Sequence, residues 1–407
     1  MNGKKLTKLE KYWILYDVGN SAFVLLVATI LPIYFNALAA GEGLSEVQYL
    51  AYWGYAASIS TLIVAVIGPI FGTIADTRGY KKPIFIMSMM VGVLGCAVLS
   101  VPTSWVIFLA VFVIAKVGYS SSLIFCDAML SDVTTPERMD MVSSHGYAWG
   151  YIGSCIPFII SLIFVLGNEA IGISMGTAMT IAFLLNAGWW LLATLPLLKN
   201  YEQKNYIERP KHVFRSSFGR LAGTFKEMKK HKKIFMFLLA FFFYIDGVYT
   251  IIEMATAYGS ALGLDSTGLL LALLLTQIVA FPFALIFGRL AKQYETGKLI
   301  KACILAYICI ALFAIQLDKQ WEFWALAVCV GMFQGAVQAL SRSYFAKIIP
   351  AEKSGEFFGI FDICGKGASF MGTALMGMFA QITGSPNGGV AILAVMFGKA
   401  EKIESGK

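Results

Sequence analysis

The feature that most constrains this chain is a series of long apolar runs, most of them near 20 residues or longer, separated by short charged segments. Such a run spans a bilayer as a helix, because lipid offers the backbone polar groups no partner outside the helix itself. The composition agrees, since 58% of the 407 residues are hydrophobic and only 14% are charged. The sequence therefore predicts an all-α integral membrane protein.

The runs predict eleven full membrane helices and a short twelfth. The last apolar run, from Val390 to Phe397, leads directly into the charged stretch Gly398–Lys402. At 1.5 Å per residue, residues 387–400 would cover about two thirds of the hydrocarbon core. The expected spans are 13–38, 49–75, 83–101, 105–130, 143–166, 173–198, 233–257, 265–289, 299–316, 322–346, 356–381 and 387–400.

A charged hinge, Gly72–Lys82, separates the second run from the third. Lysine and arginine concentrate in cytoplasmic loops of membrane proteins. With the amino terminus inside, all basic residues except Lys116, Lys319 and Lys366 fall in the two tails or in inner loops. We therefore expect a multi-pass protein of the plasma (inner) membrane with both termini in the cytoplasm.

The longest polar segment, 199–232, divides the chain into an amino-terminal bundle, 1–198, and a carboxyl-terminal bundle, 233–407. Within it, Phe218, Leu221, Phe225 and Met228 alternate with basic residues, which favours an amphipathic helix on the inner membrane face. A solvated linker is the alternative. Its charges fit anionic lipid at the inner face better than nucleic acid.

The two halves show internal repetition. Gly288-Arg-Leu-Ala-Lys292 repeats the hinge 216 residues later, with Lys292 where the first half has Asp76. Pro136-Glu137 and Gly153 also recur after a similar interval, near Pro350–Glu352 and at Gly367. A repeat of this length predicts two homologous, pseudo-symmetric six-helix bundles.

The hinge pattern resembles the signature loop between helices 2 and 3 of the major facilitator superfamily. Further motifs are similar to its vacuole-effluxer-like branch, whose eukaryotic members are associated with release of amino acids from the vacuole. These motifs are Tyr16-Asp17-x-x-Asn20-Ser21, Gly146-Tyr147-Ala-x-Gly150-Tyr151-x-Gly153, Asp246-Gly247-Val248, Gln338-Ala-Leu-Ser341-Arg342-Ser343 and Phe357-Phe358-Gly359-x-x-Asp362-x-x-Gly365-Lys366. The resemblance implies transport by alternating access around a cavity lined by helices 1, 4, 7 and 10.

The resemblance also implies a conformational lock at the hinge. Asp76 is expected to meet the amino terminus of helix 11 near Gly355 and Glu356, with Arg78 holding the acid in place. Because Lys292 replaces the acid in the second half, the lock is expected to be one-sided. The residues assigned to gating are Gly72, Asp76, Arg78, Gly79 and Lys81, with Asp127 and Arg342 as charges at the inner ends of helices 4 and 10.

Charged residues inside membrane helices mark candidate substrate or coupling sites, because each costs about 2.5–3.5 kcal/mol near mid-bilayer. We expect Lys116 and Asp246 to face the cavity and to form a pair across it. Asp17 is either a substrate or proton site or a structural anchor, Glu253 is alternatively rim-exposed, and Asp362 with Lys366 is at least as well explained by an i,i+4 ion pair. The candidates are Asp17, Asn20, Lys116, Asp246, Glu253, Gln334, Gln338, Asp362 and Lys366.

The expected function is movement of a small polar solute, with an amino acid as the narrower expectation and proton coupling through Asp17, Asp246 or Asp362. Two alternatives remain open: a lipid, lysolipid or drug transporter of the same fold, and a non-transporting receptor or scaffold. The seven cysteines and three histidines show no ligand-like spacing, so no metal or other cofactor is expected. We expect a monomer rather than an enzyme or a nucleic-acid binder, because no nucleophile and base occur in a recognisable arrangement.

Overall fold

The computed structural model describes residues 5–101, 104–228, 231–384 and 386–404, and at some positions in these ranges only the backbone. Its contacts divide the chain into two compact units. Unit 1 comprises residues 1–133, 149–217 and 352–359, and unit 2 comprises 134–148, 218–351 and 360–407. Each unit therefore takes in a short segment, 352–359 or 134–148, from the other half of the sequence.

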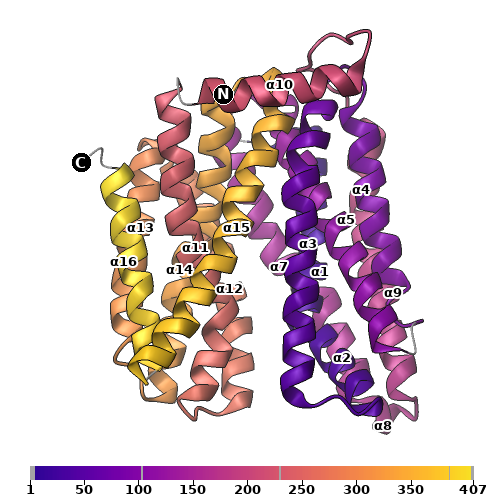
Figure 1. Ribbon diagram of the computed structural model, residues 1–407, viewed down its shortest axis with the longest axis vertical. Coiled ribbons are helices and arrows are strands. Elements are labelled where there is room, and N and C mark those ends of the chain that lie inside the picture. Colours follow the sequence, from indigo (N-terminus) through magenta and orange to yellow (C-terminus); the bar gives the residue numbers. More distant parts are fainter. Residues whose placement is uncertain (1–4, 102–103, 229–230, 385, 405–407) are drawn as a thin grey trace. The chain divides into compact units, whose positions relative to one another are not determined.

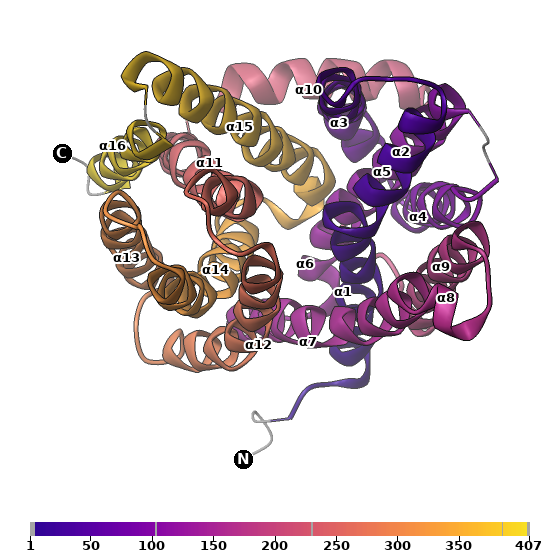
Figure 2. The same ribbon diagram turned by 90° about the horizontal axis from the view of Figure 1, so that it is seen from below.

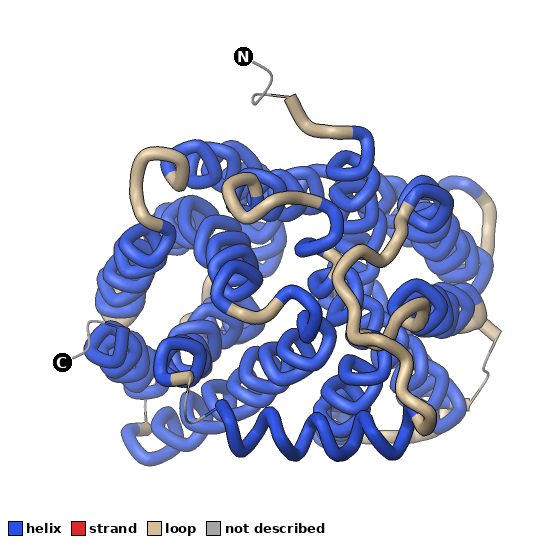
Figure 3. The backbone as a smooth tube through the Cα atoms, turned by 90° about the horizontal axis from the view of Figure 1, so that it is seen from above, coloured by secondary structure: helices blue, strands red, loops and turns tan. Residues whose placement is uncertain are grey.

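The described chain is almost entirely helical, and Figure 3 draws its regular segments as helices. Nine helical stretches among the described residues are long and apolar enough to cross a membrane. Together with α4, α15 and α16 they give the pattern of membrane helices expected from the sequence. The helices are α1 Lys8–Ala28, α2 Ile30–Gly41, α3 Glu46–Ala75, α4 Lys81–Ala97, α5 Trp105–Ala128, α6 Leu130–Val133, α7 Met139–Leu166, α8 Asn168–Ile171, α9 Met175–Asn200, α10 Val213–Met228, α11 Lys232–Ala261, α12 Ser266–Leu290, α13 Thr296–Ala314, α14 Gln320–Ile348, the 3₁₀ turn η1 Ala351–Lys353, α15 Ser354–Thr383 and α16 Pro386–Glu404.

The first membrane span consists of α1 and α2, which are interrupted at Thr29. The span begins with a capping box in which Thr7 and Glu10 satisfy each other's backbone N–H groups. The break follows from Pro32, whose ring has no N–H to donate to the carbonyl of Ala28 and is crowded against it. Thr29 turns its hydroxyl back to the Leu25 carbonyl at the break.

In unit 1, α4 packs on α5 and α9, while α3 packs on α5 and α1 packs on α9 (Figure 1). Glycines permit the closest of these approaches. A Cβ on Gly118 of α5 would lie 2.3 Å from the backbone nitrogen of Gly92 on α4. Small residues at such crossings let membrane helices make backbone-close van der Waals contact, which is what holds helices together in lipid.

In unit 2, α16 packs against α11 and α13, and α14 packs against α12 and α13 (Figure 2). The last helix, α16, has 19 residues, as many as α13, and continues beyond Lys399 into the charged stretch. It is therefore longer than the sequence suggested. The charged residues that were taken as its end occupy its last turns, where polar groups can reach the membrane interface.

Residues 213–228 of the linker form α10, a helix that joins the regions assigned to the two units. The polar residues on either side of it, 201–212 and 231, have little helix. The stretch from Tyr201 to Arg209, here called the strap, is extended and makes a single parallel bridge between Ile207 and Thr77.

Candidate functional site

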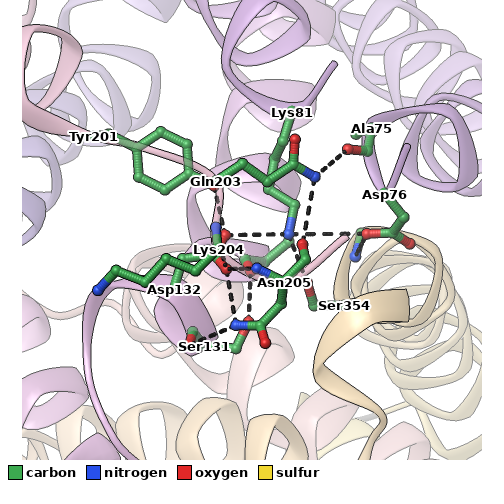
Figure 4. A network of polar contacts seen from close by, with 12 residues as sticks. Ala75, Asp76, Lys81, Ser131, Asp132, Tyr201, Gln203, Lys204, Asn205 and Ser354 are labelled. Carbon is green, nitrogen blue, oxygen red and sulfur yellow. Dashed lines mark hydrogen bonds and ion pairs between the residues drawn. The ribbon is translucent and has the colours of Figure 1, made fainter. Parts of the chain in front are cut away.

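Asp76 is the centre of a buried polar cluster in unit 1 (Figure 4). Its Oδ1 accepts the N–H of Gly355 at 2.7 Å and its Oδ2 accepts the N–H of Glu356 at 2.9 Å. Both donors belong to the first turn of α15, where unpaired N–H groups and the helix dipole attract an anion. The contact implied by the family resemblance is therefore confirmed.

Lys81, at the start of α4, is the cation of this cluster. Its Nζ lies 3.9 Å from Asp76 Oδ1 and 3.4 Å from Asp132 Oδ2, and it donates to Ser354 Oγ at 2.9 Å. The side chains of Lys81, Asp76 and Asp132 are all fully buried. We call Asp76, Lys81, Asp132, Tyr201 and Ser354 the first polar cluster.

Arg78 does not hold the acid, so that expectation was wrong. Its side chain is largely exposed, its Nη1 lies 3.5 Å from Glu208 Oε1, and its guanidinium covers the ring of Tyr206. The reason is the turn between α3 and α4. Gly79 adopts a left-handed φ of +82°, which reverses the chain and brings Lys81 rather than Arg78 beneath Asp76.

Burial raises the pKa of the Asp76 carboxyl to about 7, although Lys81 and the N–H groups of Glu356 and Gly355 act in the opposite direction. The nearby Glu356 adds a smaller upward contribution. Desolvation therefore dominates over hydrogen bonding and ion pairing at this carboxyl. The contact between Asp76 and α15 is consequently linked to proton uptake near neutral pH.

The strap closes the first polar cluster from the side of the linker. The Tyr201 hydroxyl donates to Asp132 Oδ2 at 2.5 Å, and the N–H and Nδ2 of Asn205 donate to Asp132 Oδ1 at 2.8 and 2.9 Å. Gln203 bridges the hinge itself, donating to the Ala75 carbonyl and accepting the Gly79 N–H. Burial next to Asp132 raises the pKa of Tyr201 well above its usual value, so its hydroxyl remains a donor.

Gly72 sets the spacing of the same contact. A Cβ at this position would lie 2.2 Å from the Gly355 carbonyl oxygen, and a Cβ on Gly355 would lie 2.5 Å from the Gly72 carbonyl oxygen. Neither atom belongs to a side chain that can move aside. A glycine is therefore required on both helices for α15 to approach the end of α3 closely enough to reach Asp76.

Unit 2 holds a second polar cluster around Asp140, in the first turn of α7. Asp140 Oδ1 accepts the Ser343 hydroxyl at 2.6 Å, and Oδ2 accepts the Thr296 hydroxyl at 2.9 Å and lies 2.5 Å from Lys347 Nζ. Lys347 also donates to Thr296 Oγ1 at 2.9 Å. We call Asp140, Thr296, Ser343 and Lys347 the second polar cluster.

The two clusters occupy corresponding positions of the repeat, with their charges reversed. Thr296 follows Lys81 by 215 residues, Lys347 follows Asp132 by 215, and Ser354 follows Asp140 by 214. The first half thus has a base on its third span facing an acid after its fourth span. The second half has an acid on the partner helix facing a base at the end of α14, so the expectation of a one-sided lock was wrong.

Arg342 and the close approach of Gly288 reinforce the second cluster. Arg342 is 2% exposed, donates from Nε to Ser143 Oγ at 2.9 Å, and stacks on the ring of Tyr147. A Cβ on Gly288 would lie 2.5 Å from the Ser144 Cβ, which is the counterpart of the approach at Gly72. Glycine spacing is therefore kept in the second half although the hinge acid is lost.

In unit 1, the candidate substrate residues on α1 lie within a fixed frame. Asp17 and Asn20 are 6% and 3% exposed. Their helix is tied to α5 by the Trp13 Nε1 bond to the Cys126 carbonyl and by the Tyr16–Ser122 hydroxyl pair. Among the described residues, Asn20 Nδ2 has no hydrogen-bond partner.

The other two candidates of unit 1 lie on α5. Lys116 is half-buried, with its Nζ 5.8 Å from the centre of the Phe112 ring one turn away. Asp127 is half-buried in the last turn of the helix. The acid that joins the first polar cluster is instead Asp132, five residues further on.

In unit 2, Asp246 is fully buried on α11 and accepts the N–H of Gly372 of α15 at 2.9 Å. Thr250, one turn along, donates to the same oxygen at 3.5 Å. Asp246 is thus enclosed by its own unit rather than facing a cavity, and its expected pairing with Lys116 joins two different units and stays a prediction. A Cβ on Gly372 would lie 2.3 Å from Asp246 Oδ1, so the contact depends on this glycine.

The remaining candidates of unit 2 lie on α11, α14 and α15. Lys366 Nζ and Asp362 Oδ1 are 2.5 Å apart, so the i,i+4 ion pair is present. Gln334 is 2% exposed, and its Oε1 has no hydrogen-bond partner within the described part of the chain, whereas Gln338 is half-buried. The side chain of Glu253 lies outside the described residues.

Sequence reasoning missed Asp132, Asp140, Tyr201, Thr296 and Lys347 as members of the two clusters. The repeat interval contained a usable signal, because adding it to Lys81 and Asp132 leads to Thr296 and Lys347. The reversal of charge concealed this correspondence, since the search was for an acid in place of Lys292. No comparable signal identified Tyr201, whose partner Asp132 lies 69 residues earlier.

Comparisons with known proteins agree with this architecture. The family described as "Vacuole effluxer Atg22 like" matches residues 43–137 and 131–400. An uncharacterized MFS-type transporter, YxiO, of Bacillus subtilis is 43% identical over 97% of this chain and 93% of its own length. Autophagy-related protein 22 of Yarrowia lipolytica is 26% identical over 60% of this chain, and the match spans 46% of that longer protein.

Solved structures give the same fold at low sequence identity. A major facilitator transporter, FucP, in the outward conformation has a TM-score of 0.74 with 15% identity, over 98% of this chain and 97% of that one. The proton:xylose symporter XylE has a TM-score of 0.73 with 12% identity, over 97% and 93%. The chain belongs to the vacuole effluxer Atg22-like family of major facilitator membrane transporters.

Proposed function

We propose that this transporter moves a small polar solute by alternating access, and that the solute is an amino acid. The observation that carries the proposal is the pair Asp17 and Asn20, buried one turn apart on a membrane-spanning helix. Carboxylate and amide groups are costly at such a position unless they are used. Asp17 offers an acceptor for an ammonium group, and the Asn20 Nδ2 offers a donor for a carboxylate.

The family relationship favours the same substrate class. The family is described as vacuole effluxers, and its fungal members in the comparison are named autophagy-related proteins 22. Their longer chains leave about half of their length unmatched, so activity is carried over only as part of this proposal.

Alternating access in this fold needs contacts that form and break at the ends of the helices. The two polar clusters supply such contacts in corresponding places of the repeat. Both are anchored by an acid, a base and a helix start, and each assigns a short segment of one sequence half to the other unit. We propose that they hold the inner side closed, with both termini on the cytoplasmic side of the membrane.

Proton coupling is the finer part of the proposal, and Asp17, Asp246 and Asp362 are its candidates. Asp246 is favoured, because a fully buried carboxyl that accepts a backbone N–H changes its contacts when it takes up a proton. Asp362 is held by Lys366 and is a weaker candidate. Replacement of Asp246 by Asn is expected to abolish proton-driven uptake while leaving counterflow.

The substrate class is tested by thermal unfolding of the purified protein in detergent, in the presence of amino acids, sugars, peptides or lysolipids. A ligand that binds the folded state raises its apparent stability by mass action. We expect an amino acid to raise the unfolding temperature of the wild type and of Asn186→Ala, but not of Asn20→Ala. Asn186 is a matched control, because it is equally buried and its Nδ2 is already bonded to Ser161 and Ala182.

The result also separates the alternatives. A shift caused by lysolipids and by no amino acid would replace this substrate class with an amphiphile. An amino-acid shift that survives in Asn20→Ala would remove the α1 pair from the site. Counterflow of the identified ligand in proteoliposomes then tests transport itself.

A further inference from the structure

The helix α10 has three distinct faces, of which only one is buried. Val213, Ser217 and Thr224 are 9%, 2% and 3% exposed and form the face turned into the protein. Phe214 and Phe218, one turn apart, are 65% and 55% exposed. Two large aromatic side chains are therefore presented outward by a helix that is not itself a membrane span.

The third face of α10 is basic. Arg215 and Lys226 are exposed and lie eleven residues, or about three turns, apart, which places them on one side of the helix. That side adjoins the face carrying Phe214 and Phe218. A basic stripe beside an apolar stripe is the arrangement of helices that lie in the plane of a membrane interface.

The charge of the surrounding segment has one sign. Residues 199–233 contain eleven Lys and Arg and three Glu, a difference of +8 and equal to the formal charge of the whole chain. The segment connects α9 and α11, whose ends must lie at a membrane surface if both cross the bilayer. Its charge is thus complementary to an anionic headgroup layer and not to the apolar core.

We propose that α10 is a lipid-binding surface whose occupant is anionic phospholipid at the membrane interface. Phe214 and Phe218 enter the boundary between headgroups and acyl chains, while Arg215 and Lys226 contact lipid phosphates. This inference does not depend on what the protein transports. It assigns to the linker between the two halves a ligand, rather than only the role of a connection.

The same helix is connected to the first polar cluster by only a few residues. The strap ends at Arg209, whose guanidinium lies 5.4 Å from the centre of the Tyr80 ring in the hinge, and α10 begins at Val213. Lipid on α10 therefore restrains the residues that enclose Asp132. Occupancy of the helix is expected to stabilise the folded hinge as well as α10.

The test is a thermal-unfolding titration of the full-length protein in a neutral detergent with phosphatidylglycerol or phosphatidylcholine. Each basic residue near an anionic surface contributes roughly a fivefold change in affinity. Phosphatidylglycerol is expected to raise the unfolding temperature of the wild type. The double variant Arg215→Gln/Lys226→Gln is expected to need at least about tenfold more of this lipid for the same shift.

The matched control is Lys292→Gln/Lys298→Gln, which removes two exposed basic residues from another polar loop. It should respond to phosphatidylglycerol as the wild type does. Phe214→Ser/Phe218→Ser tests the apolar face and should weaken the response while keeping the charge. All of these positions are exposed, so the variants are expected to fold, and circular dichroism verifies this.

Three outcomes would overturn the proposal. Equal shifts with phosphatidylcholine would remove the need for an anionic lipid. Equal loss in the control variant would make the response a general effect of charge. A full shift with glycerol 3-phosphate alone would assign the site to a free phosphate ester instead of a lipid surface.

Discussion

Asp76 shows how much a single buried carboxylate can organise in this protein. Its two oxygens accept different backbone N–H groups of α15, and its charge is opposed by burial and supported by Lys81. An asparagine in its place has one accepting oxygen and an NH₂ group directed at the second donor. The substitution therefore removes one hydrogen bond and places two donors against each other.

We predict that Asp76→Asn exposes the first turn of α15. Loss of a charge-assisted bond costs about 1.5–3 kcal/mol, which corresponds to roughly a tenfold to hundredfold faster amide exchange if the contact opens locally. Hydrogen–deuterium exchange of the peptide covering 352–358 measures this. Arg78→Gln is the control and should leave the exchange unchanged, because its ion pair with Glu208 is solvent-exposed. Equal protection in Asp76→Asn would contradict the assigned role.

The raised pKa of Asp76 gives a second prediction, on pH. When the contact opens, the carboxyl returns to water and to its usual pKa near 4, so the closed contact binds the proton more tightly. This stabilisation is fully present below pH 4 and is lost as the pH rises through about 7. The charged groups that face it are Lys81, Asp132 and Glu356.

Amide exchange in the 352–358 peptide, corrected for the intrinsic pH dependence, measures the effect. Protection in the wild type should fall by about tenfold between pH 5 and 8 and should be flat in Asp76→Asn. A rise of protection with pH would mean that Lys81 and the N–H groups outweigh desolvation. The test therefore decides which contribution dominates.

At the scale of helices and turns, the second polar cluster is a pair of elements held by one ion pair. Asp140 in the first turn of α7 and Lys347 in the last turn of α14 are both at helix ends where the dipole favours their charge. Both side chains are largely shielded from water. The pair is therefore expected to contribute more than a surface salt bridge.

We predict that Asp140→Asn and Lys347→Met each destabilise the protein and that their effects are not additive. A double-mutant cycle on thermal unfolding should give a coupling of about 1–3 kcal/mol. Glu295→Gln serves as the comparison, because its pair with Lys298 is exposed and should contribute less than about 1 kcal/mol. Additive effects at Asp140 and Lys347 would show that the two charges stabilise through other partners.

The elements themselves were largely predictable, because length and apolarity decide which segments can cross a bilayer. The contact of Asp76 with α15 followed from the family resemblance. The choice of Lys81 over Arg78 did not, since it depends on the left-handed turn at Gly79. The strap was taken for part of a linker, because its contacts use backbone groups and side chains whose partners lie far away in the sequence. The second cluster escaped for a similar reason, with 207 residues between Asp140 and Lys347.

For the whole molecule, the notable feature is the exchange of segments between the two units. Residues 352–359 complete unit 1 and residues 134–148 complete unit 2. A cut in the linker thus separates the chain into pieces that each lack a part of their own compact unit. This differs from the division into independent halves at 199–232 that the sequence suggested.

We predict that a fragment of residues 1–217 accumulates in membranes only when residues 218–407 are produced with it. Without residues 352–359, Gly72 and Asp76 lose the helix start that covers them. Quantitative immunoblotting of membranes with and without the second fragment tests this, and co-purification shows assembly. Equal amounts of the first fragment in both cases would indicate that it is stable by itself.

The contact between Asp76 and α15 also has a consequence for the order of synthesis. The Asp76 carboxylate and its donor on Gly355 are 279 residues apart in the chain. At translation rates of about 5–20 residues per second, the acid waits for its partner for roughly 15 to 55 seconds. During that interval the hinge of every new copy carries an uncovered carboxylate beside a bare glycine surface. Unfinished or truncated chains therefore differ chemically from complete ones at this position, which gives membrane quality control a feature to recognise.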